Sequence, residues 1–361
     1  MNAVPPQITL APGDRGPNFL LPDTTGRVWM FYERVRGNPF ILLFVGDAAE
    51  PAGREALSAA AALQDRYEAA GYDIFAVVIG EAGAAEAAAR ASGGRFMIFA
   101  DPLGKITGGY LAASGLSQAG RGCLLFDANQ RLLMAEPLAA DSPGRALERL
   151  VSLCPAAEGR IAASVAPVLI VPRVLDAAWC RDLIARWESD HEEGTVGSVV
   201  GGTEVTRVYH DVKRRRDHRI MDTEVNRQLA DLIGRRIAPE LNKAFCFREF
   251  RFDRFIVTCY DAERGDYFRR HRDNISPETS DRRFALTLNL NTEEFEGGEL
   301  WFPEYGPDRY RPETGAAIVF SCSLLHEALP VTKGRRFTLL NFLRDLGERR
   351  AVPVSAAPPP R

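Results

Sequence analysis

Closely spaced cysteines are what the sequence most plainly lacks. Its six cysteines are scattered, and none forms a Cys-x-x-Cys pair; they are Cys123, Cys154, Cys180, Cys246, Cys259 and Cys322. Zinc ribbons and disulfide frameworks both need cysteines at short, regular spacing. The sequence therefore argues against a structural zinc ribbon and against a disulfide-stapled scaffold.

An excess of charge and long apolar runs are also absent. The formal net charge is −3 over 361 residues, which gives no general case for binding nucleic acid or a membrane surface. No apolar stretch approaches the length of a membrane span, and Met1 to Pro6 lacks the basic and apolar regions of a signal peptide. We therefore expect a cytoplasmic protein with no nucleic-acid or membrane partner. The oligomeric state is left open.

The length predicts two domains, each with its own core. Residues 1–153 alternate strand-like and helical segments, which indicates an α/β domain with a partly parallel sheet covered on both faces. Residues 154–164 are small and polar, as in a linker. Residues 165–350 become β-rich and turn-punctuated, which favours an α+β domain built on a double-stranded β-helix, or jelly roll. The proline-rich tail, 351–361, is expected to be disordered.

Hydrophobic periodicity places the elements within these domains. In the first domain we expect strands at 40–45, 72–79, 96–99 and 122–127, with helices at 51–71 and 81–91. In the second we expect helices at 177–189 and 222–242, a loop or hairpin at 194–208, and strands at 168–172, 255–260, 284–290, 298–302, 317–320 and 336–343. The inner stripe of the 222–242 helix is expected to contain Leu229, Leu232, Ile233 and Ile237.

Two of the five histidines stand in a pattern that suits a metal. In an extended chain, side chains two apart point to the same side, so His271 and Asp273 can present an imidazole and a carboxylate to one point. His326, after an apolar run, is the third candidate ligand. Two histidines and one carboxylate on one face of an iron leave positions open, which suits redox chemistry with oxygen better than a closed zinc site.

A cation follows this candidate metal site. Arg336 opens an alternating run whose same-side neighbours Thr338, Leu340 and Phe342 are mostly apolar, so its side chain is expected to point inward. A buried guanidinium needs an anion with bidentate geometry, and a dicarboxylic cosubstrate supplies one. Arg335 lies on the opposite face of the strand. The plain alternative is that Arg336 is a solvated arginine at a strand end.

These residues belong to a longer pattern: Tyr260, then Gly265-Asp266-Tyr267-Phe268, His271-Arg272-Asp273, Glu296-Gly297-Gly298-Glu299-Leu300, His326, and Pro330 to Arg336. The pattern resembles the iron(II)- and 2-oxoglutarate-dependent oxygenases of the prolyl 4-hydroxylase type. The resemblance covers about the last half of the chain. It implies that His271, Asp273 and His326 bind iron and that Arg336 holds the distal carboxylate of 2-oxoglutarate. It also implies that Tyr260 hydrogen-bonds the cosubstrate, although a structural tyrosine at a strand end is an alternative, and that L-ascorbate is a candidate reductant.

The first domain looks like a peroxiredoxin, a thioredoxin-fold thiol peroxidase. The resemblance rests on Gly13 to Asp23 and on Ala100-Asp101-Pro102. Peroxiredoxins place a reactive cysteine at the start of the helix that follows the first core strand, where the helix N-terminus lowers its pKa. Gly53 stands at that position here. Cys123 lies inside an apolar strand and is interpreted as a buried small hydrophobe. Arg121 corresponds to the arginine that flanks the peroxide in active relatives.

A basic run, Lys213 to Arg219, carries five cations in seven residues. Such runs are usually solvated faces, and the alternative is a contact with a substrate carboxylate or phosphate near the site mouth. His191, His210 and His218 lack partners at ligand spacing and are treated as structural or exposed.

The leading hypothesis is a dioxygenase that couples decarboxylation of 2-oxoglutarate to succinate with hydroxylation of an unidentified substrate, using O2. That substrate is a protein side chain such as proline, or a small metabolite. The alternatives are a thiol peroxidase or redox protein acting through the first domain, and a non-catalytic iron or 2-oxoglutarate sensor. The sequence leaves open whether the first domain only docks.

Overall fold

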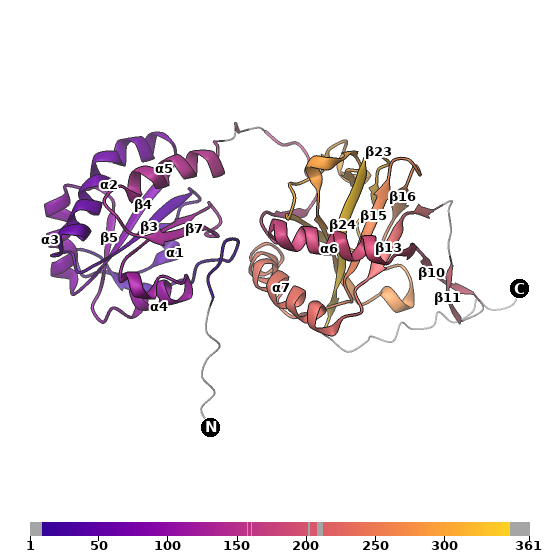
Figure 1. The fold of residues 1–361 in the computed structure, drawn as a ribbon, viewed down its shortest axis with the longest axis horizontal. Helices are drawn as coiled ribbons and strands as arrows, with labels where there is room; N and C mark the ends of the chain where they lie inside the picture. The colour runs from indigo at the N-terminus through magenta and orange to yellow at the C-terminus, as the bar shows by residue number, and fades with distance from the viewer. Residues whose placement is uncertain (1–8, 157, 160, 201–202, 208–211, 347–361) are drawn as a thin grey trace, which may run out of the picture. The chain divides into compact units, whose positions relative to one another are not determined.

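The computed structural model describes residues 9–156, 158–159, 161–200, 203–207 and 212–346. The chain divides into two compact units, Met1–Arg160 and Ile161–Arg361 (Figure 1). The division falls inside the segment expected to be a linker. The tail expected to be disordered, 351–361, lies outside the described residues. In the described part of the chain, no helix is both long and apolar enough to cross a membrane.

The first unit is built on one five-stranded sheet in the order β5-β4-β3-β6-β7. Strands β3, β4 and β5 run parallel, while β6 and β7 are antiparallel additions. The strands are β3 Phe40–Gly46, β4 Asp73–Ile79, β5 Met97–Asp101, β6 Gly122–Phe126 and β7 Leu132–Pro137, with a hairpin of β1 Leu20–Pro22 and β2 Val28–Met30 outside the sheet. The helices are α1 Phe31–Arg34, α2 Pro51–Ala69, α3 Ala82–Ser92, α4 Lys105–Ala113 and α5 Ser142–Leu153.

Alternation along β3 explains why helices cover both faces of this sheet. Ile41, Leu43 and Val45 pack in one core with α2, α3 and α5. Phe40, Leu42 and Phe44 face the other core, with α1, α4 and a group of stacked phenylalanines. A strand buried on both sides must be apolar throughout, as β3 is. The expected thioredoxin-like α/β domain is confirmed.

The second unit contains two sheets that face each other. The larger has the order β8-β21-β17-β24-β15-β13-β9, with β14 also paired to β24; the smaller has the order β12-β16-β22-β19-β20. The larger sheet consists of β8 Val168–Val171, β9 Glu192–Glu193, β13 Arg216–Arg219, β14 Phe250–Phe252, β15 Ile256–Asp261, β17 Arg282–Asn289, β21 Ala317–Ser321 and β24 Arg335–Asp345. The smaller consists of β12 Lys213–Arg214, β16 Tyr267–His271, β19 Leu300–Trp301, β20 Arg309–Tyr310 and β22 His326–Ala328. This arrangement is the expected jelly roll.

Two short antiparallel pairs complete the second unit. They are β10 Val196–Val200 with β11 Thr203–Arg207, and β18 Glu296–Gly297 with β23 Val331–Lys333. The first pair confirms the loop or hairpin expected at 194–208. Of the strand expected at 298–302, only β19 is formed.

Two helices, α6 Ala177–Ser189 and α7 Thr223–Phe245, cover the outer face of the larger sheet (Figure 1). Helix α7 begins where the Asp222 carboxylate accepts hydrogen bonds from the first backbone N–H groups, a standard N-cap. Leu229, Ile233 and Ile237 are fully buried, and Leu232 is partly buried beside them, so the expected inner stripe is confirmed. The opposite face of the sheet is thereby left to line the space between the two sheets.

Candidate metal centre and its cavity

The three candidate metal ligands lie together where strand β16 of the smaller sheet ends and strand β22 begins. His271 ends β16, His326 begins β22, and the two residues are direct partners across this antiparallel pair. His271 Nε2 lies 3.3 Å from Asp273 Oδ1, and His326 Nε2 lies 3.4 Å from Asp273 Oδ2. One ligand atom from each residue falls within 4.8 Å of the others. This clustering fits one small cation bound by two imidazoles and a carboxylate.

Asp273 reaches the cluster by a different route from the expected one. The prediction had His271 and Asp273 on the same side of one strand, but β16 ends at His271 and Asp273 lies in the following turn. The backbone N–H of Asp273 donates to the Cys322 carbonyl at 2.9 Å, which ties this turn to the end of β21. The alternation of a strand therefore does not explain the position of the carboxylate; the turn does.

Backbone contacts orient both imidazoles. His271 Nδ1 lies 2.7 Å from the Arg269 carbonyl, and His326 Nδ1 lies 3.0 Å from the Leu324 carbonyl. A carbonyl only accepts, so each Nδ1 carries the hydrogen and each Nε2 presents a lone pair to the centre of the cluster. Phe268 stacks on His271 with ring centroids 3.5 Å apart and further fixes that ring. Hydrogen bonds and packing of this kind orient the imidazole rings of metal-binding histidines.

The protonation states also suit a cation. Burial alone would raise the pKa of Asp273, but the two imidazoles and the Arg282 guanidinium outweigh it and lower the pKa below its ordinary value. Burial lowers the pKa of His326, and the Asp273 charge only partly offsets this. An ionised carboxylate beside a neutral imidazole is the form in which both groups coordinate metals.

A cavity of about 80 Å³ opens beside the cluster, between the two sheets. Nine of its seventeen lining residues are apolar or aromatic, and the other eight carry polar or ionisable side chains. The lining includes Arg215, Tyr260, Phe268, His271, Asp273, Thr287, Leu300, Phe320, His326, Arg336, Thr338, Leu340, Asn341 and Phe342. On β24, Arg336, Thr338, Leu340 and Phe342 face this cavity, as the alternating pattern predicts.

Arg336 is an orphaned cation within this cavity. Its side chain is 4% exposed, Nη2 donates to Asn289 Oδ1 at 3.3 Å, and Nε has no hydrogen-bond partner among the described residues. None of the described carboxylates forms an ion pair with it. Burial lowers the pKa of Arg336, and the nearby Arg215 charge adds to this effect. A buried guanidinium without a carboxylate is costly, so this one is suited to an anionic ligand.

Gly298 makes room for this guanidinium. A Cβ built at Gly298 would lie 2.8 Å from Arg336 Cδ and 2.9 Å from Val331 Cγ2. The residue also has φ +67°, a backbone conformation that favours glycine. The Gly-Gly pair of the sequence pattern therefore has a physical role beside the anion site.

The basic run Lys213 to Arg219 is not the solvated face that its composition favours. It forms β12 and β13 as it crosses from the smaller sheet to the larger, and Lys213, Arg215 and Asp217 are buried. Arg215 lines the cavity, and its Nη1 donates to the Tyr260 hydroxyl at 2.9 Å. Tyr260 is 3% exposed and also lines the cavity.

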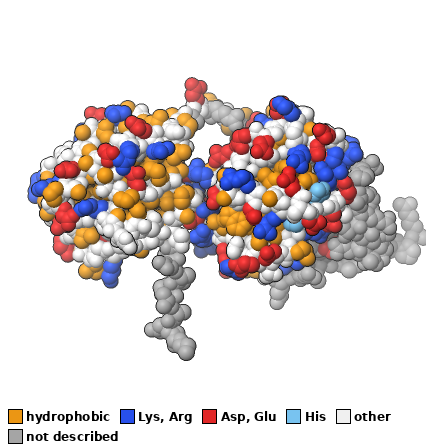
Figure 2. Space-filling model, viewed as in Figure 1, with side chains coloured by type: hydrophobic (Ala, Val, Ile, Leu, Met, Phe, Trp, Pro, Cys, Tyr) orange, Lys and Arg blue, Asp and Glu red, His pale blue; other side chains and the backbone are white. Residues whose placement is uncertain are grey.

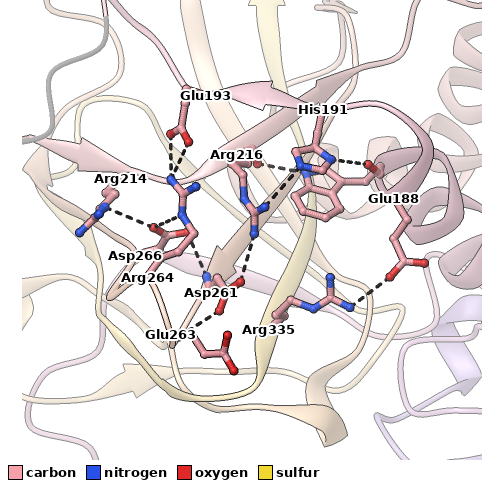
Figure 3. A network of polar contacts seen from close by, with 11 residues as sticks. Glu188, His191, Glu193, Arg214, Arg216, Asp261, Glu263, Arg264, Asp266 and Arg335 are labelled. Atoms are coloured by element: carbon pink, nitrogen blue, oxygen red, sulfur yellow. Dashed lines mark hydrogen bonds and ion pairs between the residues drawn. The ribbon is translucent and has the colours of Figure 1, made fainter.

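The alternate residues Arg214 and Arg216 pair with two buried carboxylates, one at the end of β15 and one just after it (Figure 3). Arg216 Nη2 lies 3.0 Å from Asp261 Oδ2, and Arg214 Nε lies 3.9 Å from Asp266 Oδ1. Arg335 belongs to the same outer network, where it pairs with Glu188 of α6 at 3.1 Å. The prediction that Arg335 and Arg336 lie on opposite faces of β24 is confirmed.

The other two described histidines lie away from the cluster. His191 is exposed and stacks on Trp187 with ring centroids 3.9 Å apart (Figure 3). His218 Nδ1 contacts the Asp190 carbonyl at 2.7 Å. His210 lies outside the described residues. Cationic and anionic side chains intermingle over the described surface that Figure 2 shows, in keeping with the small net charge.

Two functional candidates escaped the sequence reasoning. Arg215 lies within a run of positively charged residues. Only the alternation of side chains along an extended chain could have distinguished it from its neighbours. Asn289, which accepts from Arg336, ends the apolar strand β17 and carries no motif. Both contacts join segments distant in sequence, which single-sequence patterns do not encode.

In the first unit, the position where a peroxiredoxin carries its thiolate is closed. A Cβ at Gly53 would lie 2.7 Å from Val45 Cγ1 and 3.2 Å from the Val45 carbonyl oxygen. Arg121 forms an ion pair with Glu50, the residue that precedes α2. Cys123 is fully buried in β6, and burial raises the pKa of its thiol. The interpretation of Cys123 as a buried small hydrophobe is confirmed.

Two histidines, a carboxylate and a buried arginine thus lie around one cavity of the jelly roll, a set of residues that could hold a metal ion and an anion. Residues 255–344 match the family model of the 2OG-Fe(II) oxygenase superfamily, and residues 12–133 match that of the AhpC/TSA family. The chain thus joins a peroxiredoxin-like AhpC/TSA domain to a 2-oxoglutarate-dependent dioxygenase domain. This class implies Fe(II) as cofactor and 2-oxoglutarate and O2 as cosubstrates.

Individual proteins are similar to parts of this chain. A PKHD-type hydroxylase of Shewanella oneidensis is 27% identical over 163 residues, which cover 42% of this chain and 72% of the relative. A prolyl-4-hydroxylase structure from Pseudomonas putida is 19% identical, with a TM-score of 0.38, over 51% of this chain and 95% of that one. The peroxidoxin BcpB structure from Mycobacterium tuberculosis is 16% identical, with a TM-score of 0.36, over 40% of this chain and 98% of that one.

Proposed function

We propose that His271, Asp273 and His326 hold the iron of this dioxygenase, and that Arg336 binds the distal carboxylate of 2-oxoglutarate. One observation carries the proposal. A three-residue cluster with two Nε2 lone pairs and a carboxylate shares a cavity with a buried guanidinium that lacks a carboxylate partner among the described residues. The donor set fits iron(II), and the orphaned guanidinium fits a dicarboxylate.

Iron bound at the cluster supplies the redox chemistry by which O2 is used while 2-oxoglutarate loses carbon dioxide and becomes succinate. The protein's own residues orient and shield. Arg336 fixes one end of the cosubstrate by a bidentate contact, and the apolar lining of the cavity keeps water away from the reacting atoms. Tyr260 presents its hydroxyl to the same cavity and is proposed to hydrogen-bond the cosubstrate.

We further propose that the second half of the reaction is hydroxylation of a protein side chain such as proline, or of a small metabolite. The names of the relatives support hydroxylation. L-Ascorbate is proposed as the reductant, and omitting it should shorten the period over which succinate accumulates. A cytoplasmic location is proposed as well, because all six cysteines are free thiols, as is usual in a reducing compartment.

The test of this function follows succinate and iron together. Purified protein supplied with Fe(II), 2-oxoglutarate and O2 should form succinate, and comparing lysates with and without it by mass spectrometry should reveal products that gain one oxygen. His326→Ala should lose bound iron and succinate formation because it removes one of three ligands. His191→Ala, which changes an exposed histidine outside the cavity, should retain both. A His326→Ala protein with wild-type iron content and turnover would refute the ligand assignment.

A further inference from the structure

The buried half of the basic run forms a chain of contacts that ends at Tyr260. Asp217 stands between two cations: its Oδ1 lies 2.8 Å from Arg215 Nε, and its Oδ2 lies 3.6 Å from Lys213 Nζ. Lys213 Nζ also donates to the Thr195 carbonyl at 2.6 Å. Arg215 in turn donates to the Tyr260 hydroxyl. Three side chains, from β12, β13 and the residue between them, thus hold the Tyr260 phenol of β15 in place.

The contact with Arg215 decides which way the phenol hydrogen points. A guanidinium only donates, so Arg215 must occupy a lone pair of the Tyr260 oxygen. The hydroxyl hydrogen must therefore be donated elsewhere. Among the described residues no acceptor for it is found, although Tyr260 is buried and lines the cavity. A buried donor without an acceptor is costly, and the cavity is the place where a ligand can provide one.

The positive charges near Tyr260 favour one kind of acceptor for its hydroxyl hydrogen. The Arg336 guanidinium lies 5.4 Å from the centroid of the Tyr260 ring, and the Arg215 guanidinium lies 5.7 Å from it. Two cations near the phenol favour a negatively charged acceptor. We therefore expect the ligand atom that accepts this hydrogen bond to be a carboxylate oxygen. Asp217 already partners Arg215, so Arg215 itself is the less available of the two guanidinium groups for a direct ligand contact.

We propose that Arg215 is a positioning residue: it fixes the Tyr260 phenol so that the hydroxyl hydrogen is donated to a carboxylate oxygen of bound 2-oxoglutarate. The inference rests on the proposed function and deepens it. It gives the basic run a role in the cavity, in which Asp217 and Lys213 orient Arg215 and Arg215 acts on the cosubstrate only through Tyr260.

A double-mutant cycle tests this dependence. The variants are Arg215→Met, Tyr260→Phe and both together. Arg215→Met leaves Asp217 with Lys213 as its partner, so a buried carboxylate is not stranded. The measurement is the affinity of each Fe(II)-loaded protein for 2-oxoglutarate, titrated without oxygen and followed by the metal-to-ligand charge-transfer band. Iron content and thermal unfolding are recorded for every variant.

Each single change should weaken 2-oxoglutarate about tenfold or more, the usual effect of losing a hydrogen bond to a charged group. In the Tyr260→Phe background, Arg215→Met should cause no further loss, because the residue through which Arg215 acts is already gone. Arg216→Met is the matched control at the next residue, which pairs with Asp261 and does not line the cavity, and it should bind like the wild type. Arg215→Lys, which keeps a donor and a charge, should recover part of the affinity.

Several outcomes would overturn the inference. Equal losses from Arg215→Met in the two backgrounds would mean that the guanidinium acts directly on the ligand or on the fold. Unchanged affinity in both Arg215 variants would remove the role altogether. If Arg215→Met fails to fold, Arg215→Lys in the two Tyr260 backgrounds decides the same question. A wild-type protein that binds iron but not 2-oxoglutarate would refute the proposed function itself, and the inference with it.

Discussion

The two arginines in the cavity are buried in different ways, and the difference separates their roles. Arg215 is neutralised by Asp217 at 2.8 Å and donates to a phenol. Among the described residues, the Arg336 guanidinium donates a hydrogen bond to the amide oxygen of Asn289 and lies over the Tyr260 ring. The ion pair with Asp217 offsets the charge of the first guanidinium, whereas no described carboxylate forms an ion pair with the second. Arg336 is therefore suited to an anionic ligand rather than to a neutral one.

Burial of the Lys213 ammonium group destabilises the folded protein, and this effect should appear in the pH dependence of the free energy of unfolding. Burial and the neighbouring Arg215 lower the pKa of Lys213 from 10.5 to about 7, and Asp217 only partly opposes this. Between these two pKa values the unfolded chain binds a proton that the folded protein does not. The contribution of Lys213 to the free energy of unfolding therefore rises with pH across this window and is least favourable below about pH 7.

Lys213→Met should accordingly raise the free energy of unfolding, and the gain over wild type should be largest near pH 6.5 and shrink towards pH 10. Methionine fills much of the same volume without a charge, and Asp217 keeps Arg215. The measurement is denaturant unfolding at several pH values, followed by tryptophan fluorescence. Lys333→Met, at an exposed position, is the control and should show no such trend. A gain that does not depend on pH would contradict the titration argument.

At the scale of elements, β24 divides its side chains between two environments. Its even-numbered residues from Arg336 to Phe342 line the cavity, and odd-numbered residues such as Phe337 and Leu339 pack beneath the helices. The turn between β18 and β19 approaches the same strand at Gly298. The anion site is therefore made by a strand and a glycine turn together.

Gly298→Ala should weaken 2-oxoglutarate binding about tenfold, because the added methyl group displaces the Arg336 side chain from its position. It should also destabilise the fold by roughly 1 kcal/mol or more, since φ is positive there. Gly265→Ala is the matched control, with φ +63° but open space around its Cβ. It should share the backbone strain yet keep the affinity, as measured by anaerobic titration. Equal affinities for Gly298→Ala and Gly265→Ala would contradict the steric role.

Elements that follow from local sequence periodicity could be predicted, whereas features that depend on the pairing of distant strands could not. The stripe of α7, the apolar strand β3 and the alternation of β24 follow from the periods of helix and strand. The run Lys213 to Arg219 was misjudged because its burial depends on the register of β13 with β15, in which Arg216 pairs with Cys259. Asp273 lies in a turn, where side chains do not follow the two-residue alternation of a strand.

For the whole molecule, motifs identified the class of both units, but only the structure showed how their sites differ. In the second unit the metal ligands and Arg336 converge on one cavity. In the first, the chain has closed around Gly53. Distant contacts such as that between Arg215 and Tyr260 required the fold. The chemistry of the protein is therefore assigned to the second unit.

The first unit should show no thiol-dependent peroxidase activity. A glycine occupies the position of the nucleophile, and the Cys123 thiol is fully buried with a raised pKa. The assay is consumption of hydrogen peroxide with a dithiol reductant, with iron removed so that the second unit does not contribute. The wild type and Cys123→Ser should both be inactive. Peroxide consumption by the wild type that vanishes in Cys123→Ser would assign a redox role to this unit.

The central claim is tested most directly by titrating 2-oxoglutarate into the Fe(II)-loaded protein without oxygen. The claim is that one cavity holds iron through His271, Asp273 and His326 and the cosubstrate through Arg336. The metal-to-ligand charge-transfer band should saturate with the wild type. Arg336→Ala should weaken 2-oxoglutarate by about a hundredfold or more with iron content unchanged, because it removes a charge-assisted bidentate contact in a shielded site. Arg336→Lys should be intermediate, since lysine keeps the charge without the planar fork.

Arg335→Ala is the control in that titration, because its side chain pairs with Glu188 on the opposite face of β24 and should bind 2-oxoglutarate like the wild type. Equal affinities for wild type and Arg336→Ala, or a larger loss in Arg335→Ala, would contradict the assignment of the anchor and of the cavity that contains it.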